Sequence, residues 1–118
     1  MRVQSFRELI VWQRGIELTT AIYTLTKGLP KEEIFGLTSQ IRRAAVSIPS
    51  NIAEGQSRGT TNEFKHFLMI ARGSNAEVQT QLCLIRVLKF GDENKVAGCE
   101  VLTIEVAKML NGLIATLK

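Results

Sequence analysis

One segment, residues 40–59, constrains the fold more than any other, because it keeps a helical pattern across an internal proline. Its apolar residues recur every three or four positions and hold their phase on both sides of Pro49: Leu37, Ile41, Ala44, Ala45, Ile48 and Ile52. Pro49 has no N–H to donate to the Ala45 carbonyl, which favours a kink. Since the apolar phase is kept, we predict one continuous helix that is kinked at Pro49.

A file of polar residues runs beside the apolar file on this predicted helix. Its members follow one another at steps of seven, four, three and four and therefore share one helical face: Gln40, Ser47, Asn51, Glu54 and Arg58. A helix that only covers a core does not need such a file. The polar face is therefore expected to meet another helix or a partner.

A first helix is predicted over residues 6–27, and the proline-containing helix is expected to start between residues 31 and 37. Ser5 and Glu8 have the spacing of a capping box at the start of the first helix. Gly28 and Pro30 mark the end of that helix and the start of the next segment. The expected buried stripe of the first helix is Leu9, Trp12, Ile16, Thr19, Tyr23 and Thr26, with Ile22 and Leu25 beside it.

Two more helices are predicted over residues 61–90 and from residue 92 to the C-terminus. Thr60 and Glu63 form a second capping box, and Asp92 is a good N-cap. The expected stripe of the third helix is Phe64, Phe67, Ala71, Ser74, Val78, Gln81, Ile85 and Leu88. That of the fourth helix is Leu102, Val106, Met109, Leu113 and Leu117, with Ile104 and Leu110 beside it.

The fold class that follows is all-α: an antiparallel up-down-up-down four-helix bundle with short turns. A chain of 118 residues suits a single domain, and we expect residues 1–118 to form one bundle. Hydrophobic residues make up 45% of the chain, which is enough for a core. No segment shows the alternation of a strand.

Several functional classes are disfavoured by the sequence. Nothing resembles a signal peptide or the ~18 apolar residues of a membrane span, so we expect a soluble, cytoplasmic protein. Cys83 and Cys99 have no CxxC spacing and are expected to be reduced thiols in helices. His66 is the only histidine. We therefore expect no metal site and no cofactor.

The polar face of the second helix permits three interpretations. In an antiparallel helix pair, Asn51 and Glu54 would lie near Ser74, Glu77 or the region of Arg72 on the third helix. The first interpretation is a structural network that fixes packing or assembly, formed by Gln40, Ser47, Asn51, Glu54, Ser74 and Glu77. A second is a catalytic carboxylate pair, Glu54 with Glu77, which is weak because no nucleophile or metal ligand joins it.

The third interpretation is a surface that binds phosphate or RNA. The net charge of +4 permits such a partner but does not require one. Adjacent arginines on a helix point about 100° apart, so the positive charge would be scattered on a monomer and would repeat around a symmetric ring. The candidate residues are Arg42, Arg43, Arg58, Lys65 and Arg72.

The chain resembles the small four-helix bundle proteins encoded in intervening sequences of bacterial 23S ribosomal RNA genes. The resemblance covers residues 6–90, while the fourth helix is generic. Asn75 departs from the apolar residue common in this family, and Arg86 from a small one. The motifs that carry the resemblance are Phe6-x-x-Leu9-x-x-Trp12, Leu29-Pro30 with Glu33, Phe35-Gly36-Leu37, Gln40-Ile41-Arg42-Arg43-Ala44, the run from Ser47 through Ile48-Pro49-Ser50-Asn51-Ile52-Ala53-Glu54 to Gly55, Ala71-Arg72-Gly73-Ser74, Glu77 and Gln81-Leu82.

This resemblance implies a four-helix bundle that assembles as a homopentamer, with no enzyme activity and no cofactor. The accessory variability determinant of diversity-generating retroelements is similar, and it binds the reverse transcriptase and the RNA of its element through a basic surface. We therefore expect a non-enzymatic oligomeric bundle that serves as a scaffold for RNA or for a nucleoprotein partner such as a reverse transcriptase. The alternative is a self-assembly or protein-interaction module without a nucleic-acid role.

Overall fold

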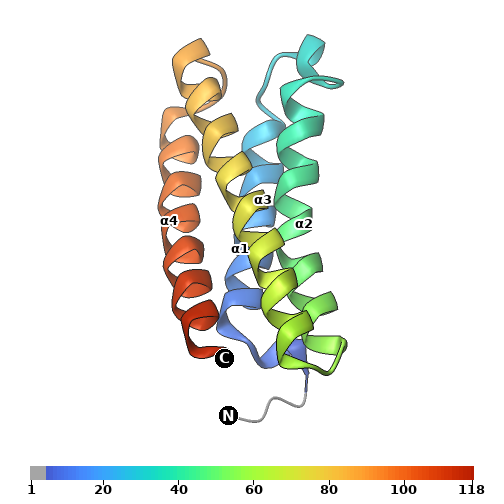
Figure 1. The fold of residues 1–118 in the computed structure, drawn as a ribbon. Helices are drawn as coiled ribbons and strands as arrows, with labels where there is room; N and C mark the ends of the chain where they lie inside the picture. The colour runs from blue at the N-terminus through green and yellow to red at the C-terminus, as the bar shows by residue number, and fades with distance from the viewer. Residues whose placement is uncertain (1–4) are drawn as a thin grey trace.

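Residues 5–118 are described in a computed structural model, and they form four α-helices and two short 3-10 helices. In Figure 1 the chain runs up α1, down α2, up α3 and down α4. Each helix packs beside the next one along the chain, and α4 closes onto α1. The prediction of an all-α four-helix bundle is confirmed. The elements are η1 (Phe6–Glu8), α1 (Ile10–Thr26), η2 (Lys31–Glu33), α2 (Leu37–Ser57), α3 (Thr61–Leu88) and α4 (Glu93–Thr116).

The helix ends follow the expected capping chemistry at two of three predicted N-caps. Thr60 accepts the Glu63 N–H at 3.2 Å, and Asp92 accepts the Asn94 N–H at 2.8 Å. Ser5 instead caps only η1, because Leu9 is extended and α1 begins at Ile10. The first helix was therefore predicted to start too early. The third helix ends two residues before the predicted end, in a left-handed turn at Lys89 with φ of 60°.

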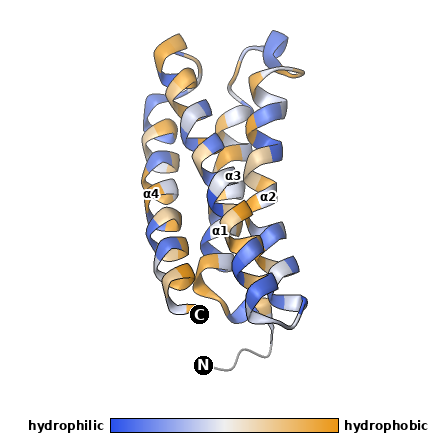
Figure 2. Cartoon of the chain, viewed as in Figure 1, coloured by the Kyte–Doolittle hydropathy of each residue, from blue (hydrophilic) through white to orange (hydrophobic). Residues whose placement is uncertain are grey.

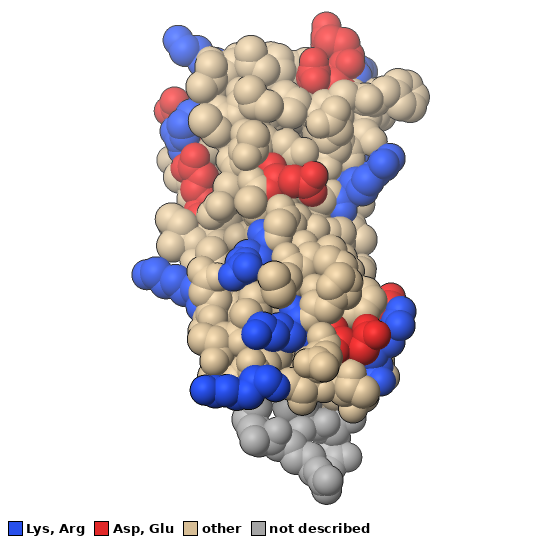
Figure 3. All heavy atoms as spheres, in the orientation of Figure 1, with Lys and Arg blue, Asp and Glu red and all other residues tan. Residues whose placement is uncertain are grey.

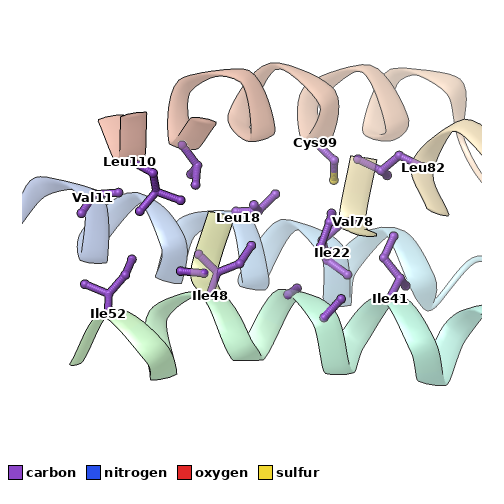
Figure 4. Packing of buried hydrophobic residues seen from close by; sticks show 14 of the residues in the cluster. Val11, Leu18, Ile22, Ile41, Ile48, Ile52, Val78, Leu82, Cys99 and Leu110 are labelled. Carbon is purple, nitrogen blue, oxygen red and sulfur yellow. The ribbon is translucent and has the colours of Figure 1, made fainter. Parts of the chain in front are cut away.

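The core draws one buried stripe from each helix, as Figure 4 shows for side chains of all four. The stripe predicted for α2 is correct. In α1 the predicted stripe is only partly correct, since Ile16 and Tyr23 are 42% and 39% exposed, whereas Leu9, Ile22, Leu25 and Thr26 are buried as predicted. In α4 the predicted stripe is offset, because most of its members lie at the half-buried edge. The residues actually buried are Val11, Gly15, Leu18, Ile22, Leu25 and Thr26 in α1, and Val96, Cys99, Thr103, Val106, Leu110 and Ile114 in α4.

The phase errors have a physical cause. Helices α1 and α4 carry apolar residues on their outer faces as well as their inner faces, so their spacing fits two phases. In α3 most of the predicted stripe is correct, but Leu88 is 50% exposed. Buried Leu68, Asn75 and Leu82 were missed there. Figure 2 shows these outer apolar residues as hydrophobic colour on outer turns at the upper end of α3.

Helix α2 is continuous through Pro49, and helix α1 supplies what the proline removes. The Ala45 carbonyl has no donor at Pro49, but the Thr19 hydroxyl of α1 lies 3.1 Å from it. The same hydroxyl lies 2.8 Å from the Gly15 carbonyl of its own helix. The proline ring lies beside Gly15 of α1, where a Cβ would be in ordinary contact with the ring carbons at 3.4 Å. The kink expected at Pro49 stays a prediction.

Helices α2 and α3 approach each other closely near the turn that joins them. A Cβ at Gly55 would lie 2.6 Å from the Cβ of Phe67 and 3.3 Å from the Phe64 carbonyl oxygen. No other residue type fits this distance without moving a helix. Gly55 therefore fixes the spacing of α2 and α3 at their lower ends.

We predict that Thr19→Val destabilises the protein by about 1–2 kcal/mol, because it leaves the buried Ala45 carbonyl without its donor. In a Pro49→Ala background residue 49 regains an N–H for that carbonyl, so the same substitution should cost about 1 kcal/mol less. Urea unfolding of the four proteins in this cycle measures the coupling. Equal costs in both backgrounds would show that Thr19 does not compensate for the proline.

We predict that Gly55→Ala destabilises the protein by about 1–3 kcal/mol through overpacking against α3. Gly98→Ala is the matched control, because nothing lies within 4 Å of a Cβ at that helical position. The control should be neutral or up to about 1 kcal/mol more stable, since alanine favours a helix over glycine. Thermal melts followed by circular dichroism compare the two, and a melting temperature for Gly55→Ala at or above that of the control would contradict the close approach.

Candidate nucleic-acid interface

Two of the five predicted cations are engaged in local packing. The Arg42 side chain donates from Nε to the Thr26 hydroxyl at 2.8 Å and lies 4.5 Å from the centre of the Tyr23 ring. It therefore joins α2 to α1. Arg58 pairs with Glu54 at 2.8 Å and lies 4.9 Å from the Phe67 ring centre. The hydrogen bond that Arg58 donates to the Glu54 carboxylate raises the pKa of Arg58, so its charge is matched by a neighbouring carboxylate.

Lys65 and Arg72 lie on a different part of the molecule, where α3 faces α4. They are seven residues apart on one side of α3, about 10 Å along its axis. Arg72 donates from Nη1 to Asn111 Oδ1 of α4 at 3.1 Å, which holds the guanidinium without neutralising it. Arg43, the fifth cation, is exposed on α2 and is not part of this group.

Charge is segregated along the α3 and α4 face. Residues 64–76 and 106–118 contain no Asp or Glu, and antiparallel packing places these two stretches side by side. Figure 3 shows Lys and Arg gathered over the lower parts of α3 and α4, whereas side chains of both signs lie over the upper parts. We define the basic surface by the cations of these stretches, Lys65, Arg72, Lys108 and Lys118.

None of the four cations of the basic surface forms an ion pair among residues 5–118. In the upper half of the same two helices, by contrast, Arg86 is paired, because it donates two hydrogen bonds of 2.7 and 3.1 Å to Glu100. That hydrogen bond lowers the pKa of Glu100. The lower cations are thus the ones available to phosphate groups, which bind arginine and lysine through charge-assisted hydrogen bonds.

Lys108 and Lys118 were missed by the sequence prediction. The signal that could have found them is the acid-free C-terminal stretch of the fourth helix, read together with the acid-free start of the third. Arg42 was included because its contact with Tyr23 depends on the fold. The Arg58 pair with Glu54 is an i,i+4 pair within α2, so the spacing of these two residues could have excluded Arg58.

The polar residues of the predicted network lie in two places. The Ser47 hydroxyl donates to the Ser74 hydroxyl across α2 and α3, and Asn51 Nδ2 donates to the Ser47 carbonyl at 2.7 Å. Gln40 and Glu77 line a shallow hollow of about 400 Å³ that also contains Ser47. Asn51 and Glu54 do not meet Ser74 or Glu77 through any hydrogen bond among the described residues.

The structure does not bring Glu54 and Glu77 together as a carboxylate pair. Glu54 is exposed and is bound to Arg58. Glu77 lines a hollow that it shares with Ser47 of α2, and Glu54 lies seven residues further along α2 than Ser47. Cys99 is buried, which raises the pKa of its thiol to about 11 and keeps it protonated. Cys83 is exposed and free.

The described residues contain no group of three or more His, Cys, Asp or Glu that could hold a metal ion. Within residues 5–118, no helix has the length and apolar content needed to cross a membrane.

Fold and surface together define a small helical bundle with an unpaired basic face. The sequence model of the 23S rRNA-intervening sequence protein family matches residues 7–112, and the chain belongs to this family. A comparison with curated proteins found no match. The crystal structure at 1.70 Å of a protein of unknown function from the S23 ribosomal protein family of Bacteroides thetaiotaomicron has the same fold. Its TM-score is 0.82 at 24% identity, over 89% of this chain and 98% of that one.

We predict that Ser47 and Ser74 are energetically coupled. Ser74→Ala should cost about 1 kcal/mol, since it removes a hydrogen bond at a buried position. The double variant Ser47→Ala/Ser74→Ala should cost less than the sum of the singles by about 0.5–1.5 kcal/mol. Glu54→Ala is the control, because its ion pair is exposed and should contribute little to stability. Chemical denaturation measures each value, and strict additivity would contradict a structural role for this pair.

Proposed function

We propose that this protein is a non-enzymatic, cytoplasmic scaffold that assembles from several copies, as a homopentamer, and binds the backbone of structured RNA or of a nucleoprotein such as a reverse transcriptase with its RNA. The observation that carries the proposal is the basic surface on α3 and α4. It combines unpaired cations with the absence of acidic residues from both stretches that form it.

The chemistry of the basic surface suits a phosphate backbone better than a base sequence. Arg72 is held by Asn111 and can offer its remaining N–H donors to a phosphate. Lys65 and Lys108 flank it as flexible point charges on the two helices. Such contacts position a nucleic acid without reading its sequence. Membership of a family named for intervening sequences of 23S rRNA supports RNA as the nucleic acid.

Self-assembly is supported by the apolar side chains left on the outside of the bundle. They include Phe35 at 94% exposure and Val87 at 68%. A groove of about 360 Å³ between α1 and α2 adds an apolar surface lined by Trp12, Ile16 and Val46. Isolated exposed apolar residues are ordinary, but a groove lined by apolar side chains is a candidate for a protein contact.

The second candidate is a self-assembly or protein-interaction module with no nucleic-acid role. The same exposed apolar residues favour it, because they need a protein partner and not RNA. The two functions differ in one measurable respect, the dependence of RNA binding on the basic surface.

We predict that Lys65→Glu/Arg72→Glu/Lys108→Glu abolishes measurable binding to a stem-loop RNA at low salt. The wild type should bind with an affinity that falls steeply with salt, because counterions are released from the RNA. Neutral variants of the same three residues should lower the slope of log affinity against log salt by about 3, or about 1 for each lost contact. Filter binding across a salt series measures both.

The matched control is Lys27→Glu/Lys31→Glu/Lys95→Glu, which makes the same change in net charge at exposed lysines outside the basic surface. Its RNA affinity should stay within a few-fold of the wild type after correction for net charge. Equal losses of RNA affinity in both triple variants would show that net charge alone, and not the basic surface, causes the effect. A wild-type protein that retains no RNA at low salt would leave the protein-only module as the function.

A further inference from the structure

The hollow that Gln40, Ser47 and Glu77 line lies on the upper parts of α2 and α3, which run side by side in Figure 1, and it receives one charged group from each helix. Arg43 of α2 supplies a cation, and Glu77 of α3 supplies an anion. Both side chains are exposed, and neither forms a hydrogen bond or an ion pair within residues 5–118. The hollow therefore has no net charge but offers a bidentate donor at Arg43 and a bidentate acceptor at Glu77.

An aromatic ring and two amides also line this hollow. Phe35 stands between η2 and α2 and is 94% exposed, so its ring is open to a planar partner. Gln40 and Gln81 carry amides that can both donate and accept hydrogen bonds. The Gln81 Oε1 atom is shielded from solvent and accepts no hydrogen bond from the described residues, so turning this amide toward a ligand sacrifices none. The volume of about 400 Å³ lies within the range of about 300–1,000 Å³ that is usual for small-molecule sites.

A nucleobase fits this combination of groups better than a phosphate or a metal ion does. Glu77 would repel a phosphate, and Arg43 would repel a metal ion. Guanine is the base that presents two adjacent N–H donors, N1 and N2, on one edge and two adjacent acceptors, O6 and N7, on another. A carboxylate can take the two donors and a guanidinium the two acceptors, while an aromatic ring stacks on the face of the base. The hollow supplies these three groups in Glu77, Arg43 and Phe35.

We infer that this hollow binds an unstacked guanine of single-stranded RNA, such as a nucleotide in a hairpin loop. Glu77 accepts hydrogen bonds from N1 and N2 of the base, Arg43 donates to O6 and N7, and Phe35 stacks on its face. The inference rests on the RNA binding in the proposed function. It adds one base-specific contact to the phosphate contacts of the basic surface, which carry no sequence information.

The hollow and the basic surface are close enough for one RNA segment to reach both. Glu77 follows Arg72 by five residues on α3, which is about 7.5 Å along the helix axis. The exposed residues between them are Gly73 and Ala76, which line an adjoining hollow of about 310 Å³ that Glu77 also lines. No bulky side chain of α3 therefore blocks the path from the basic surface to the guanine site.

Two hairpin RNAs test the inference by fluorescence anisotropy. They share one stem and a uridine loop that holds either a single guanine or a single adenine. The phosphate contacts are the same in both, so the ratio of the two dissociation constants reports the base alone. The wild type should bind the guanine hairpin at least about 10-fold more tightly, which is the discrimination expected of one good bidentate pair. Inosine in place of guanine lacks the N2 amino group and should bind several-fold more weakly than guanine.

Glu77→Gln should reduce the preference for guanine to about twofold or less, because an amide has one acceptor oxygen and cannot take both donors of the base. Its affinity for the adenine hairpin should stay within a few-fold of the wild type, since the basic surface is intact. Glu93→Gln makes the same change in charge at an exposed residue of α4 and should keep the preference. Both substituted side chains are exposed, so the fold should be unaffected, which circular dichroism checks.

Phe35→Ala should weaken binding of the guanine hairpin by at least about 5-fold, because the base loses its stacking partner. Ile104→Ala truncates an exposed apolar residue of α4 and is the matched control, which should bind as the wild type does. Sedimentation velocity separates stacking from assembly, since Val87 and the groove between α1 and α2 do not line the hollow and remain for self-association. A Phe35→Ala variant that loses assembly but keeps its affinity for the guanine hairpin would overturn the inference.

The failure of the guanine site can be told apart from the failure of RNA binding as a whole. Equal wild-type affinities for the guanine and adenine hairpins, or a preference that survives Glu77→Gln, would overturn the guanine site and leave RNA to the basic surface. A wild type that binds neither hairpin at low salt would overturn the proposed RNA function as well.

Discussion

The crossing of α1 over α2 at Pro49 is the contact on which the rest of the bundle depends. A proline in the middle of a helix costs about 3 kcal/mol, mainly through the lost hydrogen bond and a clash with the preceding turn. Here the proline ring lies beside Gly15 of α1, and the Thr19 hydroxyl lies within reach of the Ala45 carbonyl. Helix α2 therefore stays continuous and presents one face to α1 and another to α3.

The register of α3 against its neighbours follows from α2. Gly55 sets the spacing at the lower turn, and the Ser47–Ser74 hydrogen bond lies further up the same helix pair. Buried Asn75 then donates to the Thr103 carbonyl of α4 at 2.9 Å, although its Oδ1 accepts no hydrogen bond among the described residues. A buried polar group that is only partly satisfied adds little stability, but it favours one helix register over others. That register brings Arg72 to Asn111.

Helix content and capping could be predicted because they depend on local spacing. Thr60 and Asp92 cap α3 and α4 as their sequence context indicates, and the apolar file of α2 is buried as expected. The phase of α1 could not be predicted, because Ile16 and Tyr23 fit a stripe as well as Val11 and Leu18 do. The five predicted cations do not form one group for a related reason. Whether a cation such as Arg42 is engaged depends on a residue of another helix, which spacing alone does not specify.

The proposed assembly has a consequence for RNA binding. The basic surface lies on the lower parts of α3 and α4. In an assembly that leaves this surface open, every copy would contribute its own set of phosphate contacts. Linked weak sites bind a long polyanion far more tightly than one site does, because later contacts form at high effective concentration. Four cations per chain would then be enough for strong, salt-sensitive binding only in the assembled protein.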